Sequence, residues 1–384
     1  MNFPTGSWIG VLGGGQLGRM LALEARRMGF HVLMWTGGDA SGAADLADLV
    51  LTDPFDSEQA LEQFLKHADV ATVEFENIPG DLLDRVGARL PLMPGKRAVT
   101  TSQHREREKR FLADNGFPCV NFHVVTDADS LRESVAALGG DAILKTAEFG
   151  YDGKGQAGVD GAASPGELDA LWSEFDSDRA VLEEKIDLAG ELSVIVVRGH
   201  DGETLTYDPG ENQHINGILD LSIVPARFPQ EILTEAQRIA AAVADSLEYV
   251  GVLGVEFFLA ADGRLLVNEM APRPHNSGHH TIDACETSQF EQQLRAITKL
   301  PLGGTRLVQP AVMWNLLGDL WPQDGLPDWD PVLKTPGAKL HLYGKNPALP
   351  GRKMGHVTFV APTVELALEQ AEKCRAELAN AVTK

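Results

Sequence analysis

The sequence has few cysteines and no clustered ones. Cys119, Cys285 and Cys374 lie far apart and form no Cys-x-x-Cys pair, so neither a disulfide framework nor a cysteine zinc site is indicated. Long apolar runs are also missing, because the longest one, residues 249–261, is interrupted by Glu256 and is too short to cross a bilayer. The N-terminus lacks a basic region followed by an apolar core. These absences predict a soluble cytoplasmic protein.

Positive charge is scarce as well. Lys and Arg number 33 against 55 Asp and Glu, which gives a net charge of −22. Such a charge repels nucleic acid and anionic membranes, so neither is expected as a partner. A small anionic substrate remains possible where basic residues cluster in one pocket. The apolar content of 43% and the length of 384 residues predict a globular chain of two or three domains.

The first hundred residues alternate short apolar runs with amphipathic stretches. Strands are expected at 8–12, 31–35 and 70–73, and helices at 16–28 and 57–65. This βαβαβ pattern predicts a parallel sheet, and residues 1–100 are expected to form an α/β domain that binds substrate.

The remaining chain reads as mixed α+β structure. Residues 101–190 are expected to form a linker helix, at about 105–115, followed by a small lid. The helix looks like a connector rather than a core element. A central domain is expected at 191–300 and a C-terminal domain at 301–384, which would close with a helix at 364–382.

A glycine loop follows the first strand. Gly13, Gly15 and Gly18 form a Gly-x-Gly-x-x-Gly between a strand and a helix, which is the context of a phosphate-binding turn. A dinucleotide site also needs an acidic residue at the end of the second strand, where Asp39 comes somewhat late. NAD, a tight turn without ligand, and a phosphate or ribose of another small molecule are the alternatives, and the last is favoured.

Residues 252–270 have the composition of two strands joined at Asp262-Gly263. Counting outward from a two-residue turn, Glu256 pairs with Glu269. Opposed side chains on one face of an antiparallel pair have Cβ atoms about 4.5–5.5 Å apart. Two carboxylates at that distance require a cation between them or a proton on one of them.

Oxygen ligands of this kind suit Mg²⁺ better than zinc. Asn268 would add an amide oxygen beside Glu256 and Glu269. The alternative is that one glutamate points to solvent through a bulge, or that both pair with Arg or Lys.

A second glycine-rich loop runs from Gly150 to Gln156. Its backbone amides could close around phosphate while the loop stays mobile, as a lid requires. The Gly-Lys-Ser/Thr ending of a Walker A loop is absent. An ordinary hairpin turn is the alternative, but Tyr151, Asp152 and Lys154 are more functional groups than a turn needs.

Two further segments carry polar groups suited to a substrate. Lys345, Arg352 and Lys353 could hold a phosphate monoester, or could form a solvated surface patch. The histidine-rich segment 272–280 could contact substrate, with its last two histidines structural. A zinc site there is the less favoured alternative, because no suitable carboxylate or cysteine spacing accompanies it.

Taken in order, five motifs resemble the 5-(carboxyamino)imidazole ribonucleotide synthases, an ATP-grasp family of purine biosynthesis. The resemblance covers residues 8–360, and the motifs are 13–20, 74–77, 150–156, 268–278 and 351–356. It implies an ATP-grasp fold with an N-terminal parallel-sheet domain, a mobile lid and a small C-terminal domain. The implied reaction uses ATP and Mg²⁺ to convert bicarbonate into carboxyphosphate, which carboxylates the exocyclic amine of 5-aminoimidazole ribonucleotide. A homodimer is also implied.

The resemblance assigns roles by motif position. It implies that nucleotide is bound by Arg105, Lys145, Gly150, Tyr151, Asp152, Gly153, Lys154, Gly155, Gln156, Glu183, Glu184, Lys185, Ile186, Glu191, His214, Asn268 and Glu269. It implies that the imidazole ribonucleotide is bound by Gln16, Leu17, Glu76, Asp152, Arg273, His275, Asn276, Lys345, Arg352 and Lys353. Magnesium would be held by Glu256 and Glu269, and the implied catalytic residues are Tyr151, Asp152, Lys154 and Arg273.

The sequence departs from the family pattern at two places. Residues 146–149 replace an arginine-rich approach to the lid, and His104 stands where aspartate is common. Three other functions stay open: another ATP-grasp ligase such as a formate-dependent glycinamide ribonucleotide transformylase, a nicotinamide-dependent oxidoreductase, and a nucleotide-binding module without catalysis.

Overall fold

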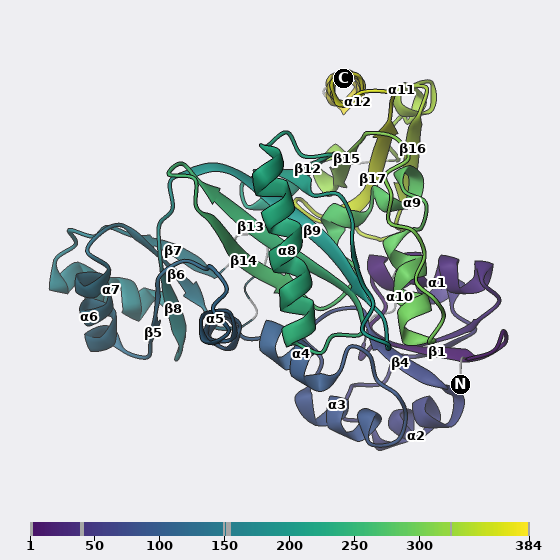
Figure 1. The fold of residues 1–384 in the computed structure, drawn as a ribbon, viewed down its shortest axis with the longest axis horizontal. Helices are drawn as coiled ribbons and strands as arrows, with labels where there is room; N and C mark the ends of the chain where they lie inside the picture. The colour runs from purple at the N-terminus through teal and green to yellow at the C-terminus, as the bar shows by residue number, and fades with distance from the viewer. Residues whose placement is uncertain (1–2, 39–41, 149, 151–154, 323–324, 383–384) are drawn as a thin grey trace.

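The computed structural model describes residues 3–38, 42–148, 150, 155–322 and 325–382, and its elements form three sheets (Figure 1). The N-terminal sheet is parallel, with the order β3-β2-β1-β4. Its strands are β1 (Trp8–Leu12), β2 (His31–Trp35), β3 (Leu49–Leu51) and β4 (Val70–Val73). The predicted parallel sheet is therefore confirmed, and β3, only three residues long, is the strand of this sheet that the sequence pattern missed.

Helices cover both faces of this sheet. Apolar side chains of β1 and β2 form one core with α1 and another with α2, so both faces are buried. The helices of this region are α1 (Gln16–Arg27), the short 3-10 turn η1 (Ala44–Leu46), α2 (Glu58–His67), α3 (Gly80–Gly87) and α4 (Lys96–Ser102).

Helix α5 (Arg105–Asp114) is a core element, which corrects the expectation of a mere connector. Phe111 and Leu112 join the largest hydrophobic cluster, together with side chains of the central sheet. Glu108 and Lys109 are buried as well. The charged sequence hid this role because both charged groups are satisfied by polar partners inside the protein.

A second, antiparallel sheet has the order β5-β8-β6-β7 and is covered on one face by two helices. Asp127 caps the first helix and Ser164 the second. Figure 1 shows this lid at the side of the molecule, with α6 and α7 on its outer face. Its elements are β5 (Phe122–Val125), α6 (Ala128–Leu138), β6 (Ala142–Thr146), β7 (Gln156–Val159), α7 (Pro165–Phe175) and β8 (Ala180–Glu184).

The third sheet has the order β14-β13-β9-β11-β12-β15-β17-β16, with β10 beside β9. It contains strands on both sides of residue 300, so the C-terminal segment extends this sheet rather than forming another. Its strands are β9 (Leu188–Arg198), β10 (Thr204–Thr206), β11 (Gly210–Ile215), β12 (Ile218–Val224), β13 (Gly251–Ala260), β14 (Leu265–Ala271), β15 (Ala311–Leu317), β16 (Ala338–Leu342) and β17 (Lys353–Val360).

Helices pack on this sheet at separate places. Helix α8 contributes to the core below β9 and β13, whereas α12 packs on β15 and β17. Helix α10 lies against α1 and so joins the sheet to the N-terminal domain. The remaining elements are α8 (Gln230–Ser246), η2 (Asn276–Gly278), α9 (Thr281–Ala284), α10 (Gln289–Ile297), η3 (Gly318–Leu320), α11 (Asp330–Leu333) and α12 (Val364–Val382).

The β13–β14 hairpin differs from the prediction at its turn. Leu259 pairs with Leu265, and the amide of Ala260 donates to the carbonyl of Arg264, so the loop has three residues rather than two. Farther along the hairpin, the register shifts by one at a bulge that leaves Asn268 without a partner on β13. Beyond the bulge, Glu256 pairs with Glu269 as predicted.

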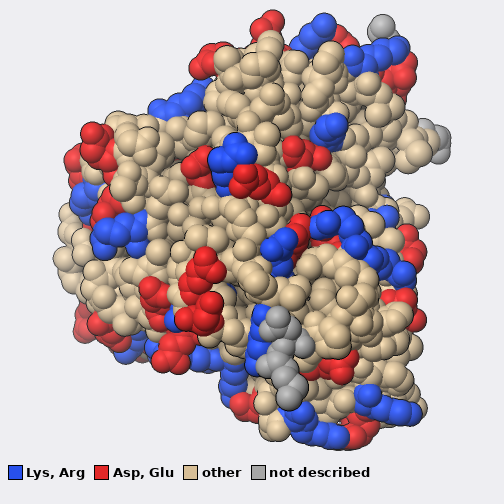
Figure 2. Space-filling view, turned by 45° about the vertical axis from the view of Figure 1, so that its right-hand side comes forward, with Lys and Arg blue, Asp and Glu red and all other residues tan. Residues whose placement is uncertain are grey.

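Acidic and basic side chains are interspersed over the face shown in Figure 2, and many adjoin a group of opposite charge. Representative surface pairs join Arg238 to Glu235 and Arg306 to Glu286. Within the described residues, no helix combines the length and the apolar character needed to cross a membrane.

Candidate active site

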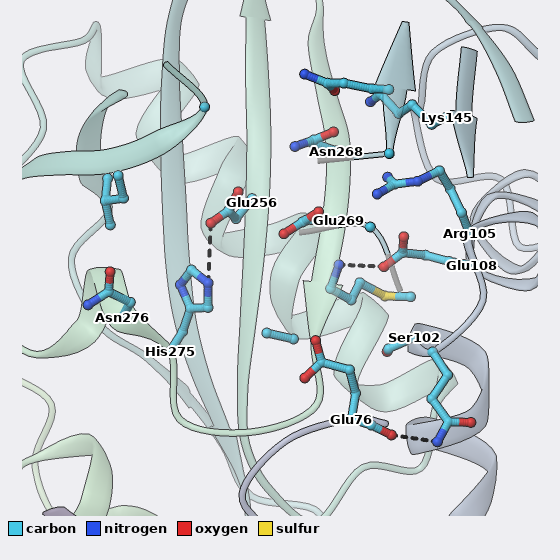
Figure 3. Close-up of a pocket in the computed structure, with 18 of the residues that line it drawn as sticks. Glu76, Ser102, Arg105, Glu108, Lys145, Glu256, Asn268, Glu269, His275 and Asn276 are labelled. Atoms are coloured by element: carbon cyan, nitrogen blue, oxygen red, sulfur yellow. Dashed lines mark hydrogen bonds and ion pairs between the residues drawn. The ribbon is translucent and has the colours of Figure 1, made fainter. Parts of the chain in front are cut away.

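A cleft of about 760 Å³ is lined by residues of the lid sheet, of the central sheet and of α5, and by residues that follow β1 and β4 of the N-terminal sheet. Figure 3 shows Glu256 and Glu269 between Arg105 and Lys145 on one side and His275 and Asn276 on the other. Glu76 and Ser102 lie at the N-terminal-domain end of the same view. The cleft is therefore a single space that a two-substrate enzyme could use.

Most of the residues that the sequence singled out line this cleft. They are Gln16, Leu17, Glu76, Arg105, Lys145, Gly150, Gly155, Gln156, Glu183, Glu184, Ile186, Glu191, His214, Glu256, Asn268, Glu269, Arg273, His275, Asn276 and Lys353. Tyr151, Asp152, Gly153 and Lys154, which include three of the four predicted catalytic residues, lie outside the described residues.

Three predicted site residues do not line the cleft. Lys345 lies just behind its wall, where Nζ donates to Oε1 of Gln16 (2.5 Å). Arg352 donates to the carbonyl of Pro347 (2.9 Å), and Lys185 borders a separate hollow on the lid. Lys345 therefore contacts the cleft indirectly, through Gln16, which lines it.

Glu256 and Glu269 form the acidic centre of the cleft. Burial and the neighbouring charge of Glu269 raise the pKa of Glu256 to about 8. Nε2 of His275 lies 3.3 Å from Oε1 of Glu256, but burial lowers the pKa of His275 well below its usual range. This imidazole is therefore neutral near pH 7 and does not compensate the acidic pair.

The residues around this pair fit a magnesium ion. Oδ1 of Asn268 is buried and has no hydrogen-bond partner, and Asn268 lines the cleft with both glutamates. In the part of the chain that the structure describes, no three His, Cys, Asp or Glu side chains are grouped as a metal site. Two carboxylates and an amide oxygen, completed by water and phosphate, match the coordination habits of Mg²⁺.

A cluster of cations surrounds Glu183 on the lid side. Nζ of Lys145 donates to Oε2 of Glu183 (2.6 Å), while Lys109 and Arg105 approach its Oε1 at 3.6 and 3.9 Å. Burial alone would raise the pKa of Glu183, but these cations lower it to about 2. Of these cations, Arg105 and Lys145 also line the cleft, where they can contact a phosphate.

Glu191 and His214 form a second polar pair on strands β9 and β11. Nδ1 of His214 lies 2.8 Å from Oε2 of Glu191. Burial favours the neutral ring, but the contact with Glu191 outweighs it and raises the pKa of His214. This pair borders the carboxylates on the side away from α5.

Arg273 and Glu76 join the central sheet to the N-terminal domain. Nε and Nη2 of Arg273 donate to the two carboxylate oxygens of Glu76, at 2.7 and 3.4 Å. Burial opposes ionisation of Glu76, but the Arg273 charge prevails and lowers the pKa of the carboxyl. The guanidinium is thereby fixed in orientation at the substrate end of the cleft.

The histidine-rich segment is held by internal hydrogen bonds. Nδ1 of His275 contacts Oγ of Ser277 (2.9 Å), and the side-chain amide of Asn276 donates to Oδ1 of Asn315 (3.0 Å). Nδ1 of His280 contacts the carbonyl of Ser277 (2.9 Å). These contacts fix His275 and Asn276 as part of the cleft wall.

The N-terminal glycine loop is occupied by a side chain, which corrects its reading as a ligand phosphate site. The amides of Gly15 and Leu17 donate to the two carboxylate oxygens of Glu74, at 3.0 and 3.1 Å. A Cβ at Gly13 or Gly15 would approach Glu74 to within 2.7 Å. The carboxylate takes the place that an anionic ligand has at other helix N-termini.

Sequence reasoning missed three residues that build the site: Glu74, Glu108 and Lys109. Glu74 follows β4 directly, so its place at the carboxyl end of a parallel strand was an available signal. Glu108 lines the cleft, and Lys109 supports it from behind. Their position on a charged helix gave no signal, because helical periodicity does not tell a buried charge from an exposed one.

Comparison with known proteins assigns each part of this architecture. Residues 7–103 match the ribonucleotide synthetase preATP-grasp domain, 110–290 the ATP-grasp domain, and 311–370 the phosphoribosylaminoimidazole carboxylase C-terminal domain. The N5-carboxyaminoimidazole ribonucleotide synthase of Bacillus subtilis is 43% identical over 355 residues, which cover 92% of each chain.

Solved structures agree over the whole length. The ADP complex of an N5-carboxyaminoimidazole ribonucleotide synthetase superposes with a TM-score of 0.90 at 39% identity, covering 100% of this chain and 99% of that one. The Aspergillus clavatus enzyme, in complex with ADP and 5-aminoimidazole ribonucleotide, gives 0.87 at 32% identity, covering 98% and 99%. With identity and coverage this high in both comparisons, this chain belongs to the N5-carboxyaminoimidazole ribonucleotide synthase family of ATP-grasp ligases.

Proposed function

We propose that this chain carboxylates the exocyclic amine of 5-aminoimidazole ribonucleotide with bicarbonate in an ATP-dependent reaction. The single observation that carries the proposal is the cleft itself, in which the acidic pair lies between two differently equipped ends. One end offers the cations Arg105 and Lys145, and the other offers Arg273, His275 and Asn276. Family membership supports the same reaction.

ATP is proposed to occupy the lid end. The backbone of 183–186 would contact adenine, and Glu191 the ribose. Arg105, Lys145 and His214, with the loop 150–156, would contact the phosphates, whose charge the cations neutralise. Glu256 and Glu269, helped by Asn268, would hold Mg²⁺, which when bound neutralises charge on the transferring phosphate.

The aminoimidazole ribonucleotide is proposed to occupy the other end. Gln16, Leu17, Glu76, His275 and Asn276 would contact the base and ribose. Lys353 would contact the phosphate, with Lys345 supporting it through Gln16 and Arg352 placed farther out. Asp152 is assigned to the same substrate.

The chemistry proceeds in two displacements. An oxygen of bicarbonate attacks the γ-phosphorus of ATP, which forms carboxyphosphate and releases ADP. The exocyclic amine then attacks the carboxyphosphate carbon, phosphate leaves, and the nitrogen loses a proton. We propose that Arg273, held by Glu76, acts with Tyr151 and Lys154 to orient the carboxyphosphate and to stabilise its charge, since cations and hydrogen-bond donors in a closed site favour developing negative charge.

Acceptor-dependent ADP release tests the proposal. Purified protein with MgATP should release ADP when bicarbonate and 5-aminoimidazole ribonucleotide are both present, and much less when either is left out. Release with formate and glycinamide ribonucleotide instead would identify a transformylase. MgATP binding without release under any condition would identify a binding module, and enhanced NADH fluorescence would identify a nicotinamide enzyme.

Two further expectations have different grounds. We expect a homodimer, which the family resemblance implies and which sedimentation velocity would measure. We also expect a cytoplasmic location, which the scarce cysteines and the missing long apolar runs predict and which fractionation of the source cells would measure.

A further inference from the structure

Two consecutive residues of α5 hold the backbone on both sides of Glu269. Nζ of Lys109 donates to the carbonyl of Asn268 (2.8 Å), and the amide of Met270 donates to Oε1 of Glu108 (2.5 Å). Figure 3 shows the second of these bonds beside Glu269. Lys109 is fully buried and Glu108 is 3% exposed.

These bonds lie where strand pairing is weakest. β14 is the outermost strand of its sheet, so its second edge has no neighbouring strand in the sheet order. The bulge at Asn268 also interrupts the ladder with β13 immediately before Glu269. The free edge is satisfied instead by the chain around α5, because the amide of Val267 donates to the carbonyl of Pro118 (2.7 Å) just before the Lys109 contact.

Local geometry makes this support important for Glu269. A bulge can move by one residue along a strand, and such a shift turns the following side chain to the opposite face of the sheet. Contacts to the residue before and the residue after Glu269 oppose that shift. They leave the Glu269 side chain directed toward Glu256 and the cleft.

Lys109 also connects this support to the nucleotide end. Its Nζ lies 3.6 Å from Oε1 of Glu183 on β8, and Glu183 is the first residue of the segment 183–186 that is proposed to contact adenine. Glu108 makes no such contact among the described interactions. The two residues therefore share one role at Glu269, and Lys109 adds a second contact.

We propose that Glu108 and Lys109 are positioning residues, which fix the backbone of Glu269 and thereby set the affinity of the cleft for magnesium. This inference rests on the proposed role of Glu256 and Glu269 as magnesium ligands. Residues that orient a metal ligand without touching the metal typically change metal affinity about 10- to 100-fold when they are removed.

Three substitutions test the inference. Glu108→Leu removes the acceptor for Met270, and Glu108→Gln keeps an amide oxygen in its place. Lys109→Met removes the donor to Asn268 at similar side-chain length. Arg110→Met is the matched control, because Arg110 is the next residue on α5 but has a largely exposed side chain that pairs with Glu106.

The measurements are the magnesium dependence of acceptor-dependent ADP release, metal-free ADP binding by calorimetry, and thermal unfolding. Glu108→Leu should raise the apparent KM for Mg²⁺ about 10-fold or more and leave metal-free ADP binding unchanged. Glu108→Gln should recover most of the loss. Lys109→Met should weaken both magnesium and metal-free ADP binding, whereas Arg110→Met should change neither.

A folded Glu108→Leu protein with the parental KM for Mg²⁺ would overturn the inference. If Glu108→Leu does not fold, Lys109→Met provides the same test, because Lys109 contacts the residue before Glu269. A folded Lys109→Met protein with the parental KM for Mg²⁺ would then overturn the inference. Glu269→Gln separates this failure from failure of the metal assignment. If Glu269→Gln leaves the magnesium dependence unchanged, the metal site is wrong; if only the α5 variants leave it unchanged, the positioning role is wrong.

Discussion

Glu256 lies directly opposite Glu269 in the β13–β14 hairpin, and both side chains line the cleft. Their proximity raises the pKa of Glu256 to about 8, after burial as the larger cause. Without a cation, two negative charges at this distance repel each other, so the ionised form of Glu256 is disfavoured. A divalent cation bound between the two carboxylates would remove this repulsion and favour the ionised form.

Glu256→Gln should therefore separate stability from activity. Removing one buried acid should leave the chelated protein as stable as before, or more stable by about 1 kcal/mol, and should reduce magnesium-dependent turnover more than about 100-fold. Thermal unfolding in EDTA and magnesium titration of ADP release measure the two effects. Glu231→Gln, at an exposed position on α8, is the control. If Glu256→Gln leaves the magnesium dependence of ADP release unchanged, Glu256 is not a magnesium ligand.

The pairing of Glu256 with Glu269 was predictable from the sequence, but the length of the hairpin loop and the bulge at Asn268 were not. The sequence favours a two-residue turn at Asp262-Gly263, whereas the loop has three residues, and Gly263 adopts the left-handed conformation (φ 90°). The bulge at Asn268 then shifts the register back by one. The two deviations cancel at the glutamates. Periodicity could reveal neither, because alternation marks the two faces of a strand but not where an extra residue enters a turn or a bulge.

Glu74→Gln should weaken the hydrogen bonds that hold the N-terminal glycine loop and so destabilise the protein. The amides of Gly15 and Leu17 each donate to a carboxylate oxygen, and a glutamine offers one acceptor and one opposing donor. We expect a loss of about 1–3 kcal/mol in the free energy of unfolding and a raised KM for aminoimidazole ribonucleotide.

Urea unfolding and steady-state kinetics measure these changes. Asp69→Asn is the comparison, because Asp69 accepts from the amide of Trp8 (2.8 Å) at the other end of β1, away from the cleft. Equal effects on the ribonucleotide KM in both variants would contradict a local role for Glu74.

Arg273→Lys should impair the substrate end of the cleft. A lysine cannot reproduce the two-point contact with Glu76. We expect the KM for aminoimidazole ribonucleotide to rise about 10-fold or more, which corresponds to about 1.4 kcal/mol, while metal-free ADP binding stays as before.

Arg227→Lys provides the control, because Arg227 makes a similar two-point contact with Glu211 outside the cleft. If the Arg273 and Arg227 variants show the same ribonucleotide KM, the proposed role of Arg273 is wrong.

His280 should make the protein sensitive to acid. Burial lowers its pKa from 6.5 to about 4, although its contact with the Ser277 carbonyl and the charge of Asp283 oppose the change. His280 is therefore protonated below about pH 6.5 in the unfolded chain, but only below about pH 4 in the folded protein. Stability from this group is present above pH 6.5 and is lost as the pH falls, by about 2 kcal/mol at pH 5.

Urea unfolding at pH 7 and pH 5 measures this contribution. His280→Asn places an amide nitrogen where Nδ1 donates to Ser277 and cannot take up the proton, so its loss of stability between the two pH values should be smaller by that amount. An identical pH response in both proteins would refute the prediction.

The sequence predicted elements that follow a local apolar pattern well, and it predicted buried charged residues poorly. The parallel N-terminal sheet and the closing helix at 364–382 follow apolar periodicity, and each is present. Glu108 and Lys109 were harder to place. Their polar partners lie on β14 and β8, and such contacts between distant segments leave no periodic trace in a single sequence.

The glycine turn occupied by Glu74 has a consequence for motif searches. A fingerprint of three glycines records the shape of a turn, yet here an acid 59 residues beyond Gly15 fills that shape from within the chain. A scan that also tests for a carboxylate directly after a neighbouring parallel strand would set such self-occupied turns apart from true cofactor sites. Engineering this turn to take a dinucleotide would have to begin at position 74, not among the glycines.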